Sequence, residues 1–281
     1  MPHAVSRLRT ARLARSTQPL FAHGGFKSER CAGCRLAPSH CMCALRPVLT
    51  TRAGVCLLMA DIEPLKPTNT GWLVADVVPD TFAFGWSRTE PDPELLALLA
   101  DPQWQPHVVF PGQYVAAERV VHSVQAADGH AAAAAAAAAS TTAAAVAIAK
   151  RPLFVLLDAT WTEARKMFRR SPYLDAFPVL SLEPGQAKSQ YKLRRAGRDG
   201  HLCTSEVAAL CMDLAGEGVA AQALEAYLAV FTHHYVKAKN QQPVEWEGAA
   251  HRRLRAVSGL GSTAGAAAND AVRGEVVDEA R

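Results

Sequence analysis

Short apolar runs separated by polar turns recur through the middle of the chain and predict buried β-strands. Each run is too short for an ordinary helix and is rich in branched or aromatic side chains. The run Phe177–Leu182 contains a proline, which cannot donate to a β-ladder, so we expect this strand at an edge of the sheet. The other predicted strands are Val55–Ala60, Thr81–Phe84, His107–Phe110 and Leu153–Leu157.

Helical patterns alternate with these strands. Pro93–Ala100 reads as a short helix with proline near its start. Thr160 and Glu163 form a capping box, which predicts that a helix begins directly after the strongest strand. Two further helices follow, one over about 205–215 and one with a single apolar face formed by Leu224, Leu228, Phe231 and Tyr235. This alternation predicts an α/β fold with a mostly parallel sheet covered on both faces.

The composition divides the chain into segments. Residues 1–28 are expected to be a disordered basic arm, 29–46 a cysteine knuckle and 47–240 the α/β domain. The alanine-rich stretch 126–150 has no amphipathic face and is expected to be an insertion in a surface loop. The Gly/Ala-rich end, 241–281, is expected to be a flexible tail.

Charge is placed unevenly on a chain of formal net charge +4. Residues 160–201 carry nine Lys and Arg against four acids, which suggests a polyanionic partner, with an ordinary solvated face as the alternative. No strongly apolar run is long enough for a membrane span, so no membrane association is expected. The N-terminal residues lack the apolar core of a secretory signal, and we expect a cytoplasmic protein, with an organelle transit peptide as the alternative.

Four of the seven cysteines fall within thirteen residues, at Cys31, Cys34, Cys41 and Cys43. Four thiolates can surround one tetrahedral ion, and zinc is the usual occupant of such a set. Because this leaves no open coordination position, we expect a structural site; disulfides are the alternative. Gly33 suits the tight turn between the first two cysteines.

A second cluster of chemistry lies at Asp158–Trp161, between the strongest strand and the capped helix. Ligands of open parallel sheets bind at this end of the strands, and helix N-terminal amides suit a carboxylate or a phosphate. The alternative is structural, with Asp158 and Thr160 satisfying a turn and a cap and Trp161 in the core. The helix that follows carries basic side chains suited to phosphates, namely Arg165, Lys166, Arg169 and Arg170.

Two more polar turns follow other predicted elements. Thr68–Gly71 comes after the first strand, and a basic loop leads into Leu202–Glu206 at a helix start. Cys203 has no identified histidine partner, so we interpret it as a packed cysteine and not as a nucleophile.

Taken in order, these motifs resemble the DTW-domain family, whose characterised members are tRNA-uridine aminocarboxypropyltransferases. The similarity spans about 31–239, interrupted by the alanine-rich stretch, and Asp61 stands where the family has histidine. The matching pieces are the four cysteines, Thr68–Gly71, Phe110–Gly112, Leu157–Trp161 with Ala164–Met167, Tyr191–Arg194 and Leu202–Glu206.

The resemblance implies a SPOUT-like fold with a C-terminal knot around the cofactor, S-adenosylmethionine as co-substrate, structural zinc, and tRNA as partner, with no stable protein partner. It implies Asp158 as the catalytic residue, either a base for uridine N3 or an orienting group. Cofactor contacts are then expected from Phe110, Pro111, Gly112, Leu157, Thr160, Leu202, Cys203, Thr204 and Glu206. RNA contacts are expected from Asn69, Thr70, Trp161, Arg165, Lys166, Arg169 and Arg194.

Three other functions fit the same motifs. The first is an enzyme that transfers methyl instead of the aminocarboxypropyl arm. The second is an aminocarboxypropyltransferase that acts on ribosomal RNA. The third is a zinc-containing RNA-binding module without chemistry. Polar turns at the ends of several separate strands favour an enzyme, because a pure binding module does not need that arrangement.

Overall fold

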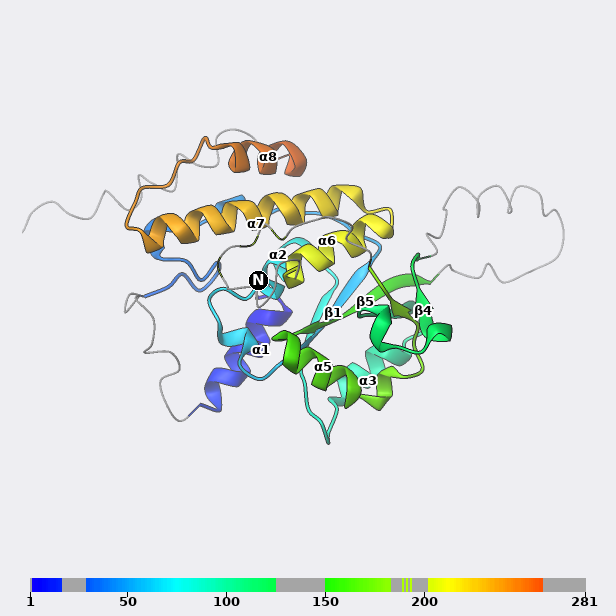
Figure 1. The fold of residues 1–281 in the computed structure, drawn as a ribbon. Coiled ribbons are helices and arrows are strands. Elements are labelled where there is room, and N and C mark those ends of the chain that lie inside the picture. The colour runs from blue at the N-terminus through cyan, green and yellow to red at the C-terminus, as the bar shows by residue number, and fades with distance from the viewer. Residues whose placement is uncertain are drawn as a thin grey trace, which may run out of the picture.

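Six parallel strands form one sheet at the centre of the protein (Figure 1). The computed structural model describes residues 2–16, 29–124, 150–182, 189, 191, 193 and 202–259. The strand order is β2-β1-β5-β3-β6-β4, and every pair is parallel, which confirms the predicted α/β class. The strands are β1 (Gly54–Met59), β2 (Thr81–Gly85), β3 (Trp104–Val109), β4 (Val120–Val121), β5 (Arg151–Asp158) and β6 (Val179–Leu180).

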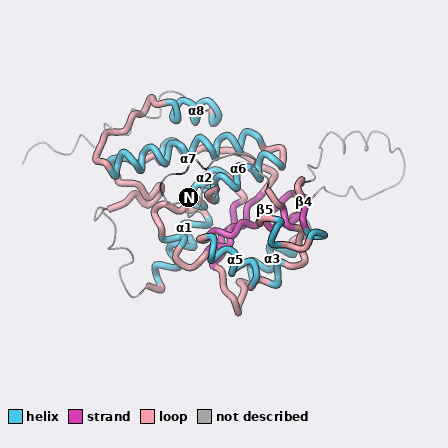
Figure 2. The backbone as a smooth tube through the Cα atoms, viewed as in Figure 1, coloured by secondary structure: helices cyan, strands magenta, loops and turns pink. Residues whose placement is uncertain are grey.

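Helices cover both faces of this sheet (Figures 1 and 2). Alternate residues of β1 enter different cores: Leu57 packs on the side of α2, α6 and α7, and Leu58 on the side of α3 and α5. All six β1 residues are therefore buried, as expected for a central parallel strand. The helices are α1 (Ala4–Ala14), α2 (Gly71–Val77), α3 (Pro93–Ala100), α5 (Trp161–Arg169), α6 (Thr204–Leu214), α7 (Gly218–Lys239) and α8 (Ala249–Ser258).

The prediction of an edge strand at Phe177–Leu182 is wrong. The strand β6 is only two residues long and lies between β3 and β4. Pro178 directly precedes it and contributes its carbonyl, which accepts from the amide of Val108 at 3.0 Å. Because the proline needs no donor in that position, it does not force the strand to the edge.

Two segments predicted to lack structure contain helices. Residues 4–14 of the expected disordered arm form α1, which packs on β2 and α2 and buries Val5 completely. Within the expected tail 241–281, α8 packs along the outer side of α7 and buries Leu254 (Figure 1). Both helices are held by tertiary contacts, which a local pattern does not reveal.

The cysteine segment is part of the main core. Its apolar residues Leu36, Met42 and Leu45 are buried in the same cluster as β1 and α7. The alanine-rich stretch 126–149 lies outside the described residues, as does most of the connection between β6 and α6, and the expected knot stays a prediction. Among the described residues, no helix is long and apolar enough to cross a membrane.

Candidate functional site

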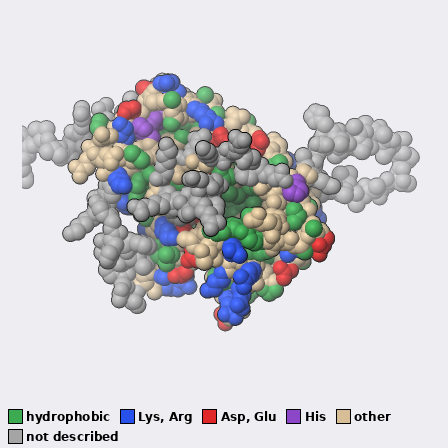
Figure 3. Space-filling model, in the orientation of Figure 1, with side chains coloured by type: hydrophobic (Ala, Val, Ile, Leu, Met, Phe, Trp, Pro, Cys, Tyr) green, Lys and Arg blue, Asp and Glu red, His purple; other side chains and the backbone are tan. Residues whose placement is uncertain are grey.

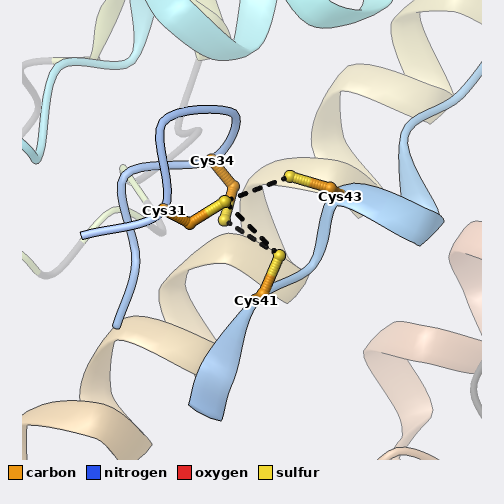
Figure 4. A group of neighbouring side chains, drawn as sticks. All are labelled: Cys31, Cys34, Cys41 and Cys43. Carbon is orange, nitrogen blue, oxygen red and sulfur yellow. Dashed lines mark hydrogen bonds between the residues drawn. The ribbon is translucent and has the colours of Figure 1, made fainter. Parts of the chain in front are cut away.

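The four cysteines of the N-terminal segment converge on one point (Figure 4). All four Sγ atoms lie within 4.8 Å of one another, and the sulfurs of Cys31–Cys43, Cys31–Cys41 and Cys34–Cys41 are 3.6, 3.6 and 3.8 Å apart. A tetrahedral ion with metal–sulfur bonds of about 2.3 Å requires sulfurs about 3.8 Å apart. The four cysteines are free thiols and not disulfides, so the set is able to hold a metal ion.

Gly33, between Cys31 and Cys34, and Arg35, directly after Cys34, shape the first part of the cysteine loop. A Cβ atom at Gly33 would lie 2.6 Å from the Cys43 sulfur, so close approach to a ligand explains the glycine. The left-handed backbone conformation in this loop belongs to Arg35, with φ of 64°, and not to Gly33.

Arg35 ties this loop to the turn after β1. The residue is 3% exposed, and its guanidinium donates to the carbonyls of Lys66 (2.8 Å) and Asn69 (2.9 Å). Its Cζ also lies 4.3 Å from the ring centroid of Trp72, whose Nε1 donates to the carbonyl of Gly33 at 2.9 Å. Burial lowers the pKa of Arg35 to about 9, which still leaves it charged at neutral pH.

Asp158 joins three segments that are far apart in the sequence. It ends β5 and is 3% exposed. Oδ2 accepts from Asn69 Nδ2 at 2.7 Å, and Oδ1 accepts from the Thr204 hydroxyl at 2.7 Å. The turn after β1, the end of β5 and the start of α6 therefore meet at one carboxylate, which we call the Asp158 junction.

The junction leaves little room around this carboxylate. A Cβ at Gly71 would lie 2.5 Å from Asp158 Oδ2, so only glycine fits there. Asn69 is fully buried, and its Oδ1 accepts from the amide of Trp72 at 3.0 Å, which fixes the side chain that holds Asp158. Both oxygens of Asp158 thus accept hydrogen bonds from the chain, and its expected catalytic role, as a base or as an orienting group, stays a prediction.

Sequence reasoning missed Glu63 and Lys66 beside the junction. Glu63 is fully buried in the short 3₁₀ helix Glu63–Leu65, with its Oε1 2.5 Å from Lys66 Nζ and its Oε2 3.4 Å from Asn69 Nδ2. The charge of Lys66 also helps to lower the pKa of Glu163, mainly depressed by its hydrogen bonds with Thr160. A buried acid three residues before a lysine is the signal that points to such a pair.

Capping boxes occupy the helix ends that were expected to bind a carboxylate. At α5, Glu163 accepts from the amide and hydroxyl of Thr160, and the Thr160 hydroxyl caps the Glu163 amide. At α6, Glu206 accepts from the amide of Cys203 at 2.7 Å. The capped amides of Thr160, Glu163 and Cys203 therefore bond to side chains of the protein itself and are not free to hold a ligand.

Cys203 is the N-cap of α6. Burial and the nearby Glu206 carboxylate raise the pKa of its thiol to about 12. Such a thiol is a poor source of thiolate, in line with its interpretation as a packed cysteine.

The predicted cofactor residues lie at the carboxyl edge of the sheet. Phe110, Pro111 and Gly112 directly follow β3, Leu157 lies in the neighbouring β5, and the turn that starts with Leu202 reaches the edge through Thr204. The Gly112 amide donates to the hydroxyl oxygen of Ser181 at 2.9 Å, which joins this turn to the end of β6.

An aromatic cluster surrounds Phe110. Its ring stacks on Phe168 at 4.3 Å and on Trp161 at 5.5 Å between centroids, and Tyr114 lies 5.7 Å from Trp161. Trp161 is therefore half-buried in this cluster, and its expected contact with RNA stays a prediction.

The RNA-contact residues fall into two places. Arg165, Lys166 and Arg169 are exposed on α5, and with Arg88 they border one cavity. Asn69 and Thr70 are buried in the Asp158 junction, where Thr70 accepts from the Ser205 amide at 3.4 Å, so these two residues hold the fold together. Arg194 lies outside the described residues.

The fold and site define an α/β protein with polar turns gathered at the carboxyl edge of a parallel sheet, beside a cysteine cluster able to hold a metal. The family model described as DTW domain matches residues 28–236, most of the chain, and the protein belongs to the DTW-domain family. This membership supports a tRNA-modifying kind of function. No solved structure matches the chain.

Proposed function

We propose that this protein transfers the 3-amino-3-carboxypropyl group of S-adenosylmethionine to N3 of a uridine in tRNA. The observation that carries the proposal is the Asp158 junction, where three segments typical of the family are joined by the hydrogen bonds of Asn69 and Thr204 to one buried carboxylate. This junction lies at the sheet edge where parallel α/β proteins bind ligands.

The reaction forms one bond and breaks one. Uridine N3 attacks the arm's methylene carbon bonded to the sulfonium, the C–S bond breaks, and its electron pair returns to sulfur to release methylthioadenosine. The sulfonium supplies the leaving group, so the protein has to align the arm in line with N3 in preference to the methyl group. We assign this alignment to the turns that Asp158 holds together.

Uridine N3 must also lose its proton. The two oxygens of Asp158 already accept hydrogen bonds, so we assign Asp158 to orientation and the N3 proton to solvent. The exposed cations Arg165 and Lys166 on α5 favour the uridine anion electrostatically.

The cysteine cluster fits a structural zinc ion. Four thiolates would complete the coordination of zinc, which leaves no position for a substrate. Its contribution is to hold the loop that carries Arg35, and through Arg35 the turn that carries Asn69.

The proposal is tested by incubating the purified protein with unmodified tRNA and S-adenosylmethionine and analysing the nucleosides by mass spectrometry. A uridine that gains the aminocarboxypropyl mass, with release of methylthioadenosine, supports it. A methyl gain would replace it by methyl transfer, and modification of ribosomal RNA alone would change the substrate. RNA binding without any affinity for S-adenosylmethionine would favour the alternative of a zinc-containing RNA-binding module without chemistry.

A further inference from the structure

A cavity of about 380 Å³ lies beside α5 and is lined by residues other than those of the Asp158 junction. Five of its six lining side chains are cationic and none is acidic; the lining residues are Arg88, Thr162, Arg165, Lys166, Arg169 and Arg170. Figure 3 shows this group as the most concentrated patch of Lys and Arg on the visible face, over α5 and the β2–α3 connection.

The charge of the cavity is only partly balanced by the protein, through the electrostatic interaction of Lys166 with Glu163. None of the five cations forms a salt bridge with an acidic residue in the described part of the chain. The nearest acid on the helix, Glu163, is bound to Thr160 in the capping box. Holding five like charges around one space costs free energy that an anionic ligand would offset.

The two sides of the cavity are fixed to each other. Arg88 lies in the connection between β2 and α3, and the neighbouring Trp86 donates from Nε1 to the hydroxyl of Ser171 at 3.0 Å, just beyond α5. Lys166 also lies over the Trp86 ring, with Nζ 5.9 Å from its centroid. The backbone segments that carry Arg88 and the cations of α5 are therefore held together without a ligand.

An exposed aromatic ring adjoins this site. Tyr114 is 40% exposed, and the guanidinium of Arg165 lies 4.8 Å from its ring centroid. On its other side Tyr114 is 5.7 Å from Trp161, which begins α5 three residues after Asp158. A cationic track beside an exposed aromatic ring is the arrangement with which proteins bind single-stranded nucleic acid.

We propose that the cavity binds consecutive phosphates of the RNA strand and that Tyr114 stacks on a base beside the target nucleotide. Arg88 and Arg170 contact the RNA backbone. The line from Arg165 through Tyr114 to Trp161 leads the RNA strand toward the Asp158 junction. The choice of tRNA as the RNA rests on the proposed function. The contact residues themselves follow from the charge and the exposed ring.

The test measures binding of fluorescently labelled tRNA over a series of salt concentrations. We expect Arg88→Glu and Arg170→Glu each to weaken binding about tenfold and to reduce the salt dependence by about one phosphate contact. Arg252→Glu, at an exposed position of α8, is the matched charge control and should leave both quantities nearly unchanged. Tyr114→Ala should weaken binding without changing the salt dependence, and Tyr114→Phe should bind like the unaltered protein.

Unchanged tRNA affinity in both Arg88→Glu and Arg170→Glu, or an equal loss in Arg252→Glu, would overturn the proposal. Inorganic pyrophosphate that competes with tRNA at micromolar concentration would identify a small-anion site and also overturn it. Binding does not require transfer. If the Arg88 and Arg170 variants lose RNA affinity while the unaltered protein modifies no nucleotide, the proposed function fails and the RNA site stands.

Discussion

The Arg35 guanidinium donates to the backbone carbonyl of Asn69 at 2.9 Å, and the Asn69 side chain donates to Asp158 at 2.7 Å. A residue between two cysteines of the cysteine cluster is thus two hydrogen bonds away from the carboxylate at the sheet edge. The cysteine cluster and the candidate site are parts of one hydrogen-bonded structure, and three predictions depend on this connection.

Replacing Arg35 by lysine should destabilise the protein more than the small change in side-chain size suggests. Lysine keeps the charge but has no planar fork, so Arg35→Lys leaves the carbonyl of Lys66 or of Asn69 without its donor. An unsatisfied buried group costs about 1–3 kcal/mol, which denaturant unfolding measures. Arg252→Lys on α8 is the control, with an expected change within about 0.5 kcal/mol. Equal unfolding free energies for the two variants would contradict the role of Arg35.

Removing the metal should loosen the turn after β1 as well as the cysteine loop. We expect a chelator, or Cys34→Ser, to speed hydrogen exchange of the amides over residues 66–72, because Arg35 and Gly33 bond to that turn. Cys211→Ala removes a buried cysteine outside the cluster and should keep one metal per chain by elemental analysis. Equal exchange rates over residues 66–72 with and without the metal would contradict a connection between the cysteine loop and the turn after β1.

Asp158 and Thr204 should act as a unit. Asp158→Asn places a donor where both partners already donate, and we expect the transfer rate to fall by about 10²-fold or more. Thr204→Val removes one hydroxyl and should have a smaller effect, and the double variant should resemble Asp158→Asn alone. If Asp158 orients, Asp158→Asn lowers the rate across the whole pH range. Loss of a single titrating limb in the pH–rate profile would identify Asp158 as the base instead.

The contact between α7 and α8 should weaken in acid. Nε2 of His234 lies 2.8 Å from Nε2 of His251, a hydrogen bond that needs at least one neutral ring. Burial, aided by the neighbouring His233, lowers the pKa of both imidazoles to about 4. In the unfolded chain the pKa is about 6.5, so the stabilisation is complete above that pH and is lost as pH falls toward 4.

Hydrogen exchange of α8 between pH 7 and pH 5, corrected for intrinsic rates, measures this effect. Besides His233, the groups that act on His251 are Arg255, which lowers its pKa, and Glu247, which raises it. His251→Gln removes one titrating ring and should reduce the pH dependence of α8. Equal pH dependence with and without His251 would rule out the histidine pair as its source.

Local patterns in the sequence were sufficient for much of this fold. The helix α3 has the predicted bounds, and the capping box of Thr160 and Glu163 is present at the start of α5. Both depend on residues close in sequence. The spacing of Cys31, Cys34 and the later pair likewise restricts the sulfurs to a small volume, which the structure confirms.

Features that depend on distant partners could not be predicted in the same way. The helix α1 is basic with a weak apolar face, and Arg9 donates to the carbonyl of Leu65 while Arg12 pairs with Asp61 at 2.7 Å. The partners of these two arginines lie about fifty residues away in the sequence, so the local pattern does not identify them. The bond of Asn69 to Asp158 spans 89 positions, and no local pattern identifies such a pair.

The central claim is transfer of the aminocarboxypropyl arm to tRNA, and its most direct test uses S-adenosylmethionine carrying one isotope in the arm and another in the methyl group. After incubation with unmodified tRNA, the arm label is predicted in uridine and the methyl label in released methylthioadenosine. Methyl label in the tRNA, with the arm label left in the nucleoside by-product, would contradict the claim.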